Sequence, residues 1–220
     1  MSYFALIFLV LVLGIGSNAL IKQTYKKWKK HPTGFGVSGA DAARTMLNSN
    51  GLQHVKIVEI SGDLSDHFDP RTNVVSLSSE VYRGNTVSAI AVACHECGHA
   101  VQHSKEYAPA VVRGKIVPVV SLASNAWVFV LIIGIFLQMM GLVYVAVILF
   151  GTVLLFQLVT LPVEFDASKR GLAFIEGSNW LTQTEIGGAK SVLRAAAMTY
   201  VAAALASILQ LIYLLGMARR

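Results

Sequence analysis

The chain has 220 residues, of which 55% are hydrophobic and only 14% are charged, and its formal net charge is +6. A mean hydropathy of +0.60 excludes an ordinary soluble protein or a disordered chain and is typical of membrane proteins. The positive charge does not call for nucleic acid as a partner, because Lys and Arg residues beside membrane segments interact with anionic lipid headgroups.

The first predicted element is an uncharged stretch, Tyr3 to Ile21, about as long as the 20 residues that a bilayer requires. A secretory signal has positive residues before its apolar core and a cleavage site after it, whereas here the lysines follow the stretch. We therefore predict an uncleaved N-terminal anchor over residues 1–21. Because Lys and Arg accumulate on the cytoplasmic side, the N-terminus is expected outside. The lysines are Lys22, Lys26, Lys27, Lys29 and Lys30.

Residues 22–116 are predicted to form a cytoplasmic α+β domain of zincin type. Ser38 and Asp41 have capping-box spacing and open a helix that stops at Asn50-Gly51. Alternating residues then indicate strands at 54–60 and 73–78, separated by a turn-rich loop. We expect the two strands to form a hairpin, and the second of them to be able to accept an extended substrate by strand addition. A plain structural role for that strand is the alternative.

An H-E-x-x-H pentapeptide, His95 to His99, lies in an apolar, helix-compatible run from Thr86 to Gln102. On a helix, residues four apart share one face, so His95 and His99 could hold one zinc ion while Glu96 stands beside a bound water. Two histidines and a glutamate would be costly to bury in such a helix without a metal or other partners. The alternative is a pair of core histidines satisfied by hydrogen bonds. The pattern predicts the metal ligands and the catalytic base of a zinc hydrolase.

The two cysteines, Cys94 and Cys97, lie on the same predicted helix. Their C-x-x-C spacing suggests a redox pair or a thiolate zinc site. Helix geometry points both of them well away from the mean direction of the two histidines, and no further cysteine completes a structural site. We interpret them as small buried apolar residues.

Two further uncharged runs, Val117 to Gln138 and Leu142 to Pro162, are separated by only three residues. They are predicted to form a transmembrane helical hairpin over residues 117–162. The chain then returns to the face from which it left, so residues 163–194 are expected on the cytoplasmic side as a helical segment. A fourth span, within residues 195–220, completes the topology.

Two histidines leave a catalytic zinc under-coordinated, so a third protein ligand is expected. His103 is excluded by reach, because it lies about 12 Å along the helix from His95. The metzincin pattern is also excluded, because Gln102 and Lys105 replace the required Gly and His. Glu164 is the better candidate: it follows the third span, where we expect a helix to begin and acidic residues to be favoured. The two intervening crossings place it on the same side as His99, and Asp166 is its rival.

Four segments together resemble the YugP-type membrane zinc metallopeptidases, which are similar in plan to the HtpX-type integral membrane gluzincins. They are 66–71 (DHFDPR), 77–78 (LS), 93–102 (ACHECGHAVQ) and 161–168 (LPVEFDAS). In that plan H-E-x-x-H supplies two ligands and a Glu in an E-x-x-A-D segment supplies the third. Here Glu164 stands at the position of that Glu, and Ser168 replaces the final Asp.

The sequence therefore predicts a mainly α membrane protein with about four transmembrane helices, in a bacterial cell membrane, with its catalytic domain facing the cytoplasm. One Zn²⁺ held by His95, His99 and Glu164, with Glu96 as general base, would hydrolyse membrane-associated proteins or peptides. The alternatives are an inactive zinc-binding scaffold and a transporter-like protein. Small residues in the last span are compatible with a second copy or a partner membrane protein. Candidate stabilisers of the oxyanion are His67, Arg71, His103, Tyr107 and Arg170.

Overall fold

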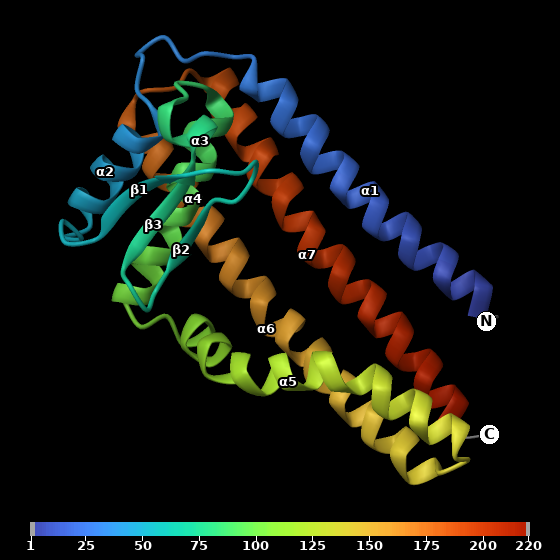
Figure 1. Cartoon of the computed structure of the whole chain (residues 1–220). Coiled ribbons are helices and arrows are strands. Elements are labelled where there is room, and N and C mark those ends of the chain that lie inside the picture. Colours follow the sequence, from blue (N-terminus) through green and yellow to red (C-terminus); the bar gives the residue numbers. More distant parts are fainter. Residues whose placement is uncertain (1–2, 219–220) are drawn as a thin grey trace. The chain divides into compact units, whose positions relative to one another are not determined.

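The structure is a computed structural model that describes residues 3–218, and most of them are helical (Figure 1). The chain divides into two compact units. One consists of the segments up to Asn18, Ala108–Pro162 and from Met198 onward, and the other of Ala19–Tyr107 and Val163–Ala197. Three long helices contribute residues to both units. The candidate site lies entirely in the second unit.

Within residues 3–218, four helices are long and apolar enough to cross a membrane, and each covers all or nearly all of one predicted span; the second helix ends at Phe136, two residues before the predicted end. Their surfaces expose large apolar side chains, such as Phe129 and Phe136, as lipid contact requires. The turn between the second and third of these helices, residues 137–139, is as short as predicted. The helices are α1 (Tyr3–Lys29), α5 (Ala108–Phe136), α6 (Met140–Ser178) and α7 (Gln183–Ala218).

In the second unit, α2 (Gly39–Ser49) begins and ends as the sequence predicts. The Ser38 hydroxyl accepts from the Asp41 backbone N–H and the Asp41 carboxylate accepts from the Ser38 N–H, which completes the capping box. Gly51, with φ of 75°, adopts the left-handed conformation that ends the helix region. The apolar face of α2, which includes Met46 and Leu47, is fully buried in the core of this unit.

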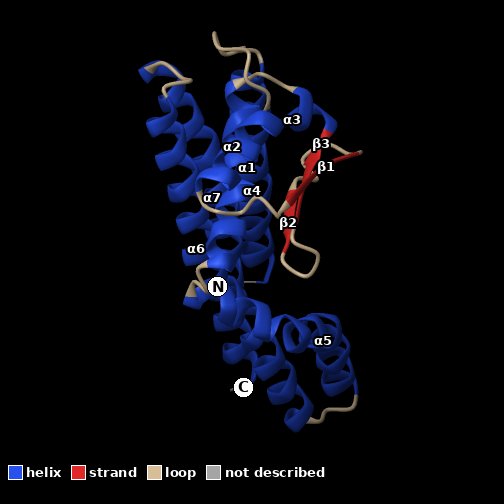
Figure 2. Ribbon diagram, turned by 90° about the vertical axis from the view of Figure 1, so that its left-hand side faces the viewer, coloured by secondary structure: helices blue, strands red, loops and turns tan. Residues whose placement is uncertain are grey.

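The sheet differs from the predicted hairpin. Its three strands are β1 (Lys56–Ile60), β2 (His67–Asp69) and β3 (Val74–Ser78), in the order β1-β3-β2 (Figure 2). β1 and β3 run parallel, and β2 pairs antiparallel with β3. Parallel neighbouring strands need a crossover connection, and the segment between β1 and β3 provides it. This segment contains β2, which is too short to show an alternating pattern. Because β3 pairs on both sides, the prediction that it accepts a substrate strand is wrong.

After the short helix α3 (Ser79–Arg83), α4 (Val87–Ser104) contains the H-E-x-x-H segment. The Thr86 hydroxyl accepts a hydrogen bond from the Ala89 N–H and so caps the helix start. Most of its residues are buried, including Ala91, Cys94 and Cys97. This burial confirms the interpretation of α4 as a core helix and of the two cysteines as buried, unpaired residues.

The segment around Glu164 differs from the sequence expectation. No helix begins there, because α6 continues from Met140 to Ser178 through Pro162. A proline inside a helix removes one backbone hydrogen bond, and here the long helix tolerates that loss. Glu164 therefore lies mid-helix, and the argument from acidic residues at a helix start does not apply to it.

Two glycines let the backbones of α4 and α6 come into direct contact. A Cβ on Gly98 would lie 2.5 Å from the Ala167 carbonyl oxygen, and a Cβ on Gly171 would lie 2.9 Å from the Cys94 carbonyl carbon. Both distances are far below van der Waals contact with rigid backbone atoms. The small residues thus set the spacing of the two helices around the candidate site.

Substitution of Gly98 by Ala is expected to destabilise the protein by about 1–3 kcal/mol, because the added methyl group forces the helices apart. Thermal unfolding of the purified protein in detergent measures the effect. Gly177→Ala is the matched control, since Gly177 is likewise a glycine inside a helix, α6, but has open space around it. That control should be neutral or stabilising by up to about 1 kcal/mol. Equal unfolding temperatures for the two variants would contradict the proposed close contact.

Candidate metal centre

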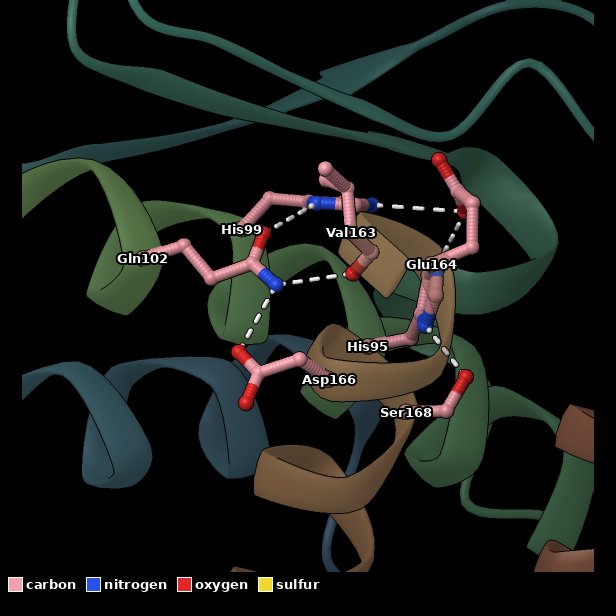
Figure 3. A network of polar contacts seen from close by, with 7 residues as sticks. All are labelled: His95, His99, Gln102, Val163, Glu164, Asp166 and Ser168. Atoms are coloured by element: carbon pink, nitrogen blue, oxygen red, sulfur yellow. Dashed lines mark hydrogen bonds and ion pairs between the residues drawn. The ribbon is translucent and has the colours of Figure 1, made fainter. Parts of the chain in front are cut away.

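Two histidines from α4 and one glutamate from α6 meet at one point (Figure 3). Their potential ligand atoms all lie within 4.8 Å of one another. The Glu164 Oε2 atom is 3.4 Å from His95 Nε2 and 3.7 Å from His99 Nε2. The sequence predicted these three residues as a ligand set, and the fold brings them together.

The donor set fits a zinc ion. Tetrahedral zinc with bonds of about 2.0–2.1 Å to nitrogen and oxygen places its ligand atoms roughly 3.4 Å apart. The two distances to Glu164 are close to that value. The side chain of Glu164 is only 4% exposed, whereas those of His95 and His99 are 14% and 16% exposed. Catalytic zinc sites typically have three protein ligands and one open position, and the partial exposure of both histidines fits that arrangement.

Negative charge accumulates around this point. Burial lowers the pKa of His99, but the hydrogen bond to Glu164 and the charges of Glu96 and Glu164 outweigh it, so the pKa is raised overall. Burial also raises the pKa of Asp66, and the charge of Glu96 adds to that rise. A divalent cation would offset the repulsion among these carboxylates.

Glu96, the predicted general base, follows His95 directly on α4 and is 8% exposed. Successive helical residues differ in direction by about 100°, so Glu96 lies beside the two histidines without replacing either as a ligand. It is not among the three residues whose ligand atoms converge. This position is compatible with a proton acceptor next to a bound water.

The Nδ1 atom of each histidine, on the side of the ring away from Glu164, is also within hydrogen-bond distance of a polar side chain. Ser168 Oγ lies 3.1 Å from His95 Nδ1, and Gln102 Oε1 lies 3.1 Å from His99 Nδ1. Ser168, which replaces the final Asp of the E-x-x-A-D pattern, thus contacts the ring of His95. The Gln102 contact was not predicted from sequence. The sequence spacing could have indicated this contact, because a residue three positions after His99 lies on the same helix face.

The rival ligands lie elsewhere. His103 is exposed, and its ring lies 5.9 Å from that of Phe68 on β2. The Asp166 carboxylate accepts a hydrogen bond from Gln102 and pairs with Arg170. Neither His103 nor Asp166 belongs to the converging group.

The other polar candidates make local contacts. His67 is exposed and its ring contacts the Ser65 carbonyl, and Arg71 pairs with Asp69. Arg170 lies over the ring of Tyr107, 5.8 Å from its centroid. Asp66 accepts hydrogen bonds from the Ser78 N–H and hydroxyl. These hydrogen bonds give Asp66 a structural role in its loop, as is typical of turn-forming and capping residues.

Four apolar helices and a His-His-Glu cluster are the features expected of a membrane-associated zinc peptidase, and comparison with known proteins gives that class. The chain belongs to the family described as "Putative neutral zinc metallopeptidase", whose model matches residues 3–219. It is also similar to the "Putative membrane protease YugP" of Bacillus subtilis (strain 168), with 41% identity over 212 residues, covering 96% of this chain and 94% of that protein. No solved structure matches the chain.

Proposed function

We propose that the protein is a membrane-embedded endopeptidase of gluzincin type, in which His95, His99 and Glu164 hold one zinc ion per chain. The observation that supports it most strongly is that three potential ligand atoms from two helices lie within 4.8 Å of one another, with Glu164 Oε2 at 3.4 Å and 3.7 Å from the two histidine nitrogens. Membership in a zinc metallopeptidase family adds independent support. The H-E-x-x-H spacing on α4 supplies both histidines from one helix face.

The reaction is hydrolysis of a peptide bond. A zinc ion at this site supplies Lewis acidity, which lowers the pKa of a water molecule and polarises the scissile carbonyl. Glu96 accepts the proton of the attacking water, and the new C–O bond forms at the carbonyl carbon. Glu96 then returns that proton to the amine nitrogen as the C–N bond breaks. His95, His99 and Glu164 would hold the zinc ion.

We also propose that the site works at the cytoplasmic membrane surface on membrane-associated proteins or peptides. Glu164 comes two residues after the predicted span ends at Pro162. The part of α6 before Glu164, residues 140–163, has 24 residues, about 36 Å of helix, which exceeds the hydrocarbon thickness of a bilayer, about 30 Å. The helix is thus long enough to cross the membrane and still present Glu164 beyond it. The lysines at the end of α1 favour the cytoplasmic side for residues 22–116 and 163–194.

A metal-removal experiment tests this proposal. The full chain is placed in inside-out and right-side-out bacterial membrane vesicles, and a membrane-impermeant unfolded protein such as β-casein is added outside. We expect zinc-dependent cleavage only with inside-out vesicles. A chelator should abolish it and Zn²⁺ should restore it, whereas Mg²⁺, which prefers oxygen ligands, should not.

Metal removal tests the metallopeptidase mechanism, and vesicle orientation tests the cytoplasmic location of the site. Cleavage that persists after complete removal of zinc would refute the metallopeptidase mechanism. Cleavage confined to right-side-out vesicles would refute the cytoplasmic orientation and leave the mechanism standing. The His95→Ala variant in the same vesicles controls for proteases of the host membrane.

A further inference from the structure

Gln102 is a buried polar residue that connects the two ligand-bearing helices. It lies on α4 and is 1% exposed. Its side chain touches one predicted ligand on its own helix and two residues of α6, which flank Glu164 in the sequence (Figure 3). A buried amide with so many partners is costly to place unless all its bonds are satisfied.

The contacts fix the orientation of the amide group. Gln102 Nε2 lies 2.7 Å from the Val163 carbonyl oxygen and 2.8 Å from Asp166 Oδ2. A carbonyl and a carboxylate only accept hydrogen bonds, so both must face the NH₂ end of the amide. The amide oxygen therefore faces His99, as the 3.1 Å distance from Oε1 to Nδ1 requires.

This orientation decides which nitrogen of His99 is protonated. An amide oxygen can only accept, so His99 Nδ1 must donate and therefore holds a proton. In the neutral ring the lone pair then lies on Nε2, the nitrogen that faces Glu164. Only this tautomer presents His99 Nε2 as a metal ligand. At His95 the partner is the Ser168 hydroxyl, which can donate or accept and so leaves the tautomer open.

We propose that Gln102 is a positioning residue that holds His99 in its metal-binding tautomer and fastens α4 to the segment of α6 that contains Glu164. The inference rests on the proposed metal site. Val163 directly precedes Glu164, so its bond to Gln102 fixes the backbone at the third ligand. Arg170 pairs with Asp166 and so holds the second acceptor in place. One side chain thereby aligns ligands from both helices.

The test compares zinc affinity of full-length variants in detergent, measured by competition with a chelator of known affinity. Gln102→Leu keeps the approximate size but removes all three bonds, and we expect about a 10–100-fold loss of zinc affinity, as for other residues that orient metal ligands. Ser88→Ala is the matched control. Ser88 is equally buried on α4, and its hydroxyl donates to the Tyr25 carbonyl rather than to the site. This control should retain wild-type affinity.

Gln102→Glu separates the two parts of the role. It keeps an oxygen for the His99 Nδ1 proton but lacks the amide donors for Val163 and Asp166. Its affinity should fall below wild type but less than that of the leucine variant. Wild-type affinity in both variants would overturn the proposal, and so would an equal loss in Ser88→Ala. Wild-type affinity in the glutamate variant alone would overturn the connection to α6.

A spectroscopic measurement on the metal-free wild type tests the same proposal and does not depend on whether any variant folds. Nitrogen NMR of the 15N-histidine-labelled chain, at a pH where His99 is neutral, should show the proton on Nδ1. A neutral ring with its proton on Nε2 would overturn the proposal. Failure of the proposed function looks different, because the wild type and His99→Ala would then bind zinc equally weakly whatever stands at position 102.

Discussion

Replacement of Glu96 by glutamine is expected to reduce peptide cleavage by about 10²–10⁴-fold, the usual contribution of a general base. Glutamine has nearly the same size as glutamate but cannot accept the proton of the attacking water. Zinc content should stay at the wild-type level, because Glu96 is not one of the three converging residues. Parallel measurements of bound zinc and of β-casein cleavage in vesicles check both expectations.

The combination of the two measurements distinguishes the alternatives. Wild-type cleavage by Glu96→Gln would remove this residue from the mechanism. Zinc binding without cleavage in the wild type, under every condition tried, would favour the inactive scaffold instead. Glu176→Gln is a matched control, because Glu176 is an exposed carboxylate on α6 outside the site.

Replacement of Glu164 by alanine is expected to lower zinc affinity by more than about 100-fold, beyond the usual effect of losing a residue that only orients a ligand. In the proposed site the Glu164 carboxylate is the third protein ligand, and two histidines alone would leave zinc under-coordinated. Chelator competition on the purified variant provides the affinity. Cleavage should be lost with the metal.

Asp166→Ala provides the sharpest comparison, because Asp166 lies two residues away on the same helix. Asp166 touches Gln102 rather than the converging group, so its removal should cost less, about 10-fold to 100-fold. A larger loss for Asp166 than for Glu164 would reverse the assignment of the third ligand. Glu176→Ala should bind zinc like the wild type.

Much of the candidate site follows from local and topological rules that a sequence makes visible. The spacing of His95 and His99 directly predicts one helix face. Glu164 could be chosen over His103 because reach along a helix is calculable and because two membrane crossings return the chain to its starting face. The structure brings these three residues together. Their roles as ligands, and that of Glu96 as base, stay predictions.

The parts that the sequence did not reveal depend on tertiary contacts. Three residues, His67–Asp69, are too few to show strand alternation, so β2 was missed and the pairing of β1 with β3 was taken for a hairpin. The sequence analysis predicts a helix boundary at Pro162, whereas α6 continues through this residue. The sequence does not predict the role of Gln102, because its partners on α6 become neighbours only in the folded chain.

The long path between the two halves of the site has a consequence for biogenesis. Gln102 and Val163 are 61 positions apart in the sequence. The ribosome synthesises α5 and most of the apolar part of α6 between them. A nascent chain that has completed α4 therefore contains both histidines and Glu96 but not yet Glu164. With the proposed ligand set, cleavage competence should therefore arise only after the membrane hairpin has been synthesised.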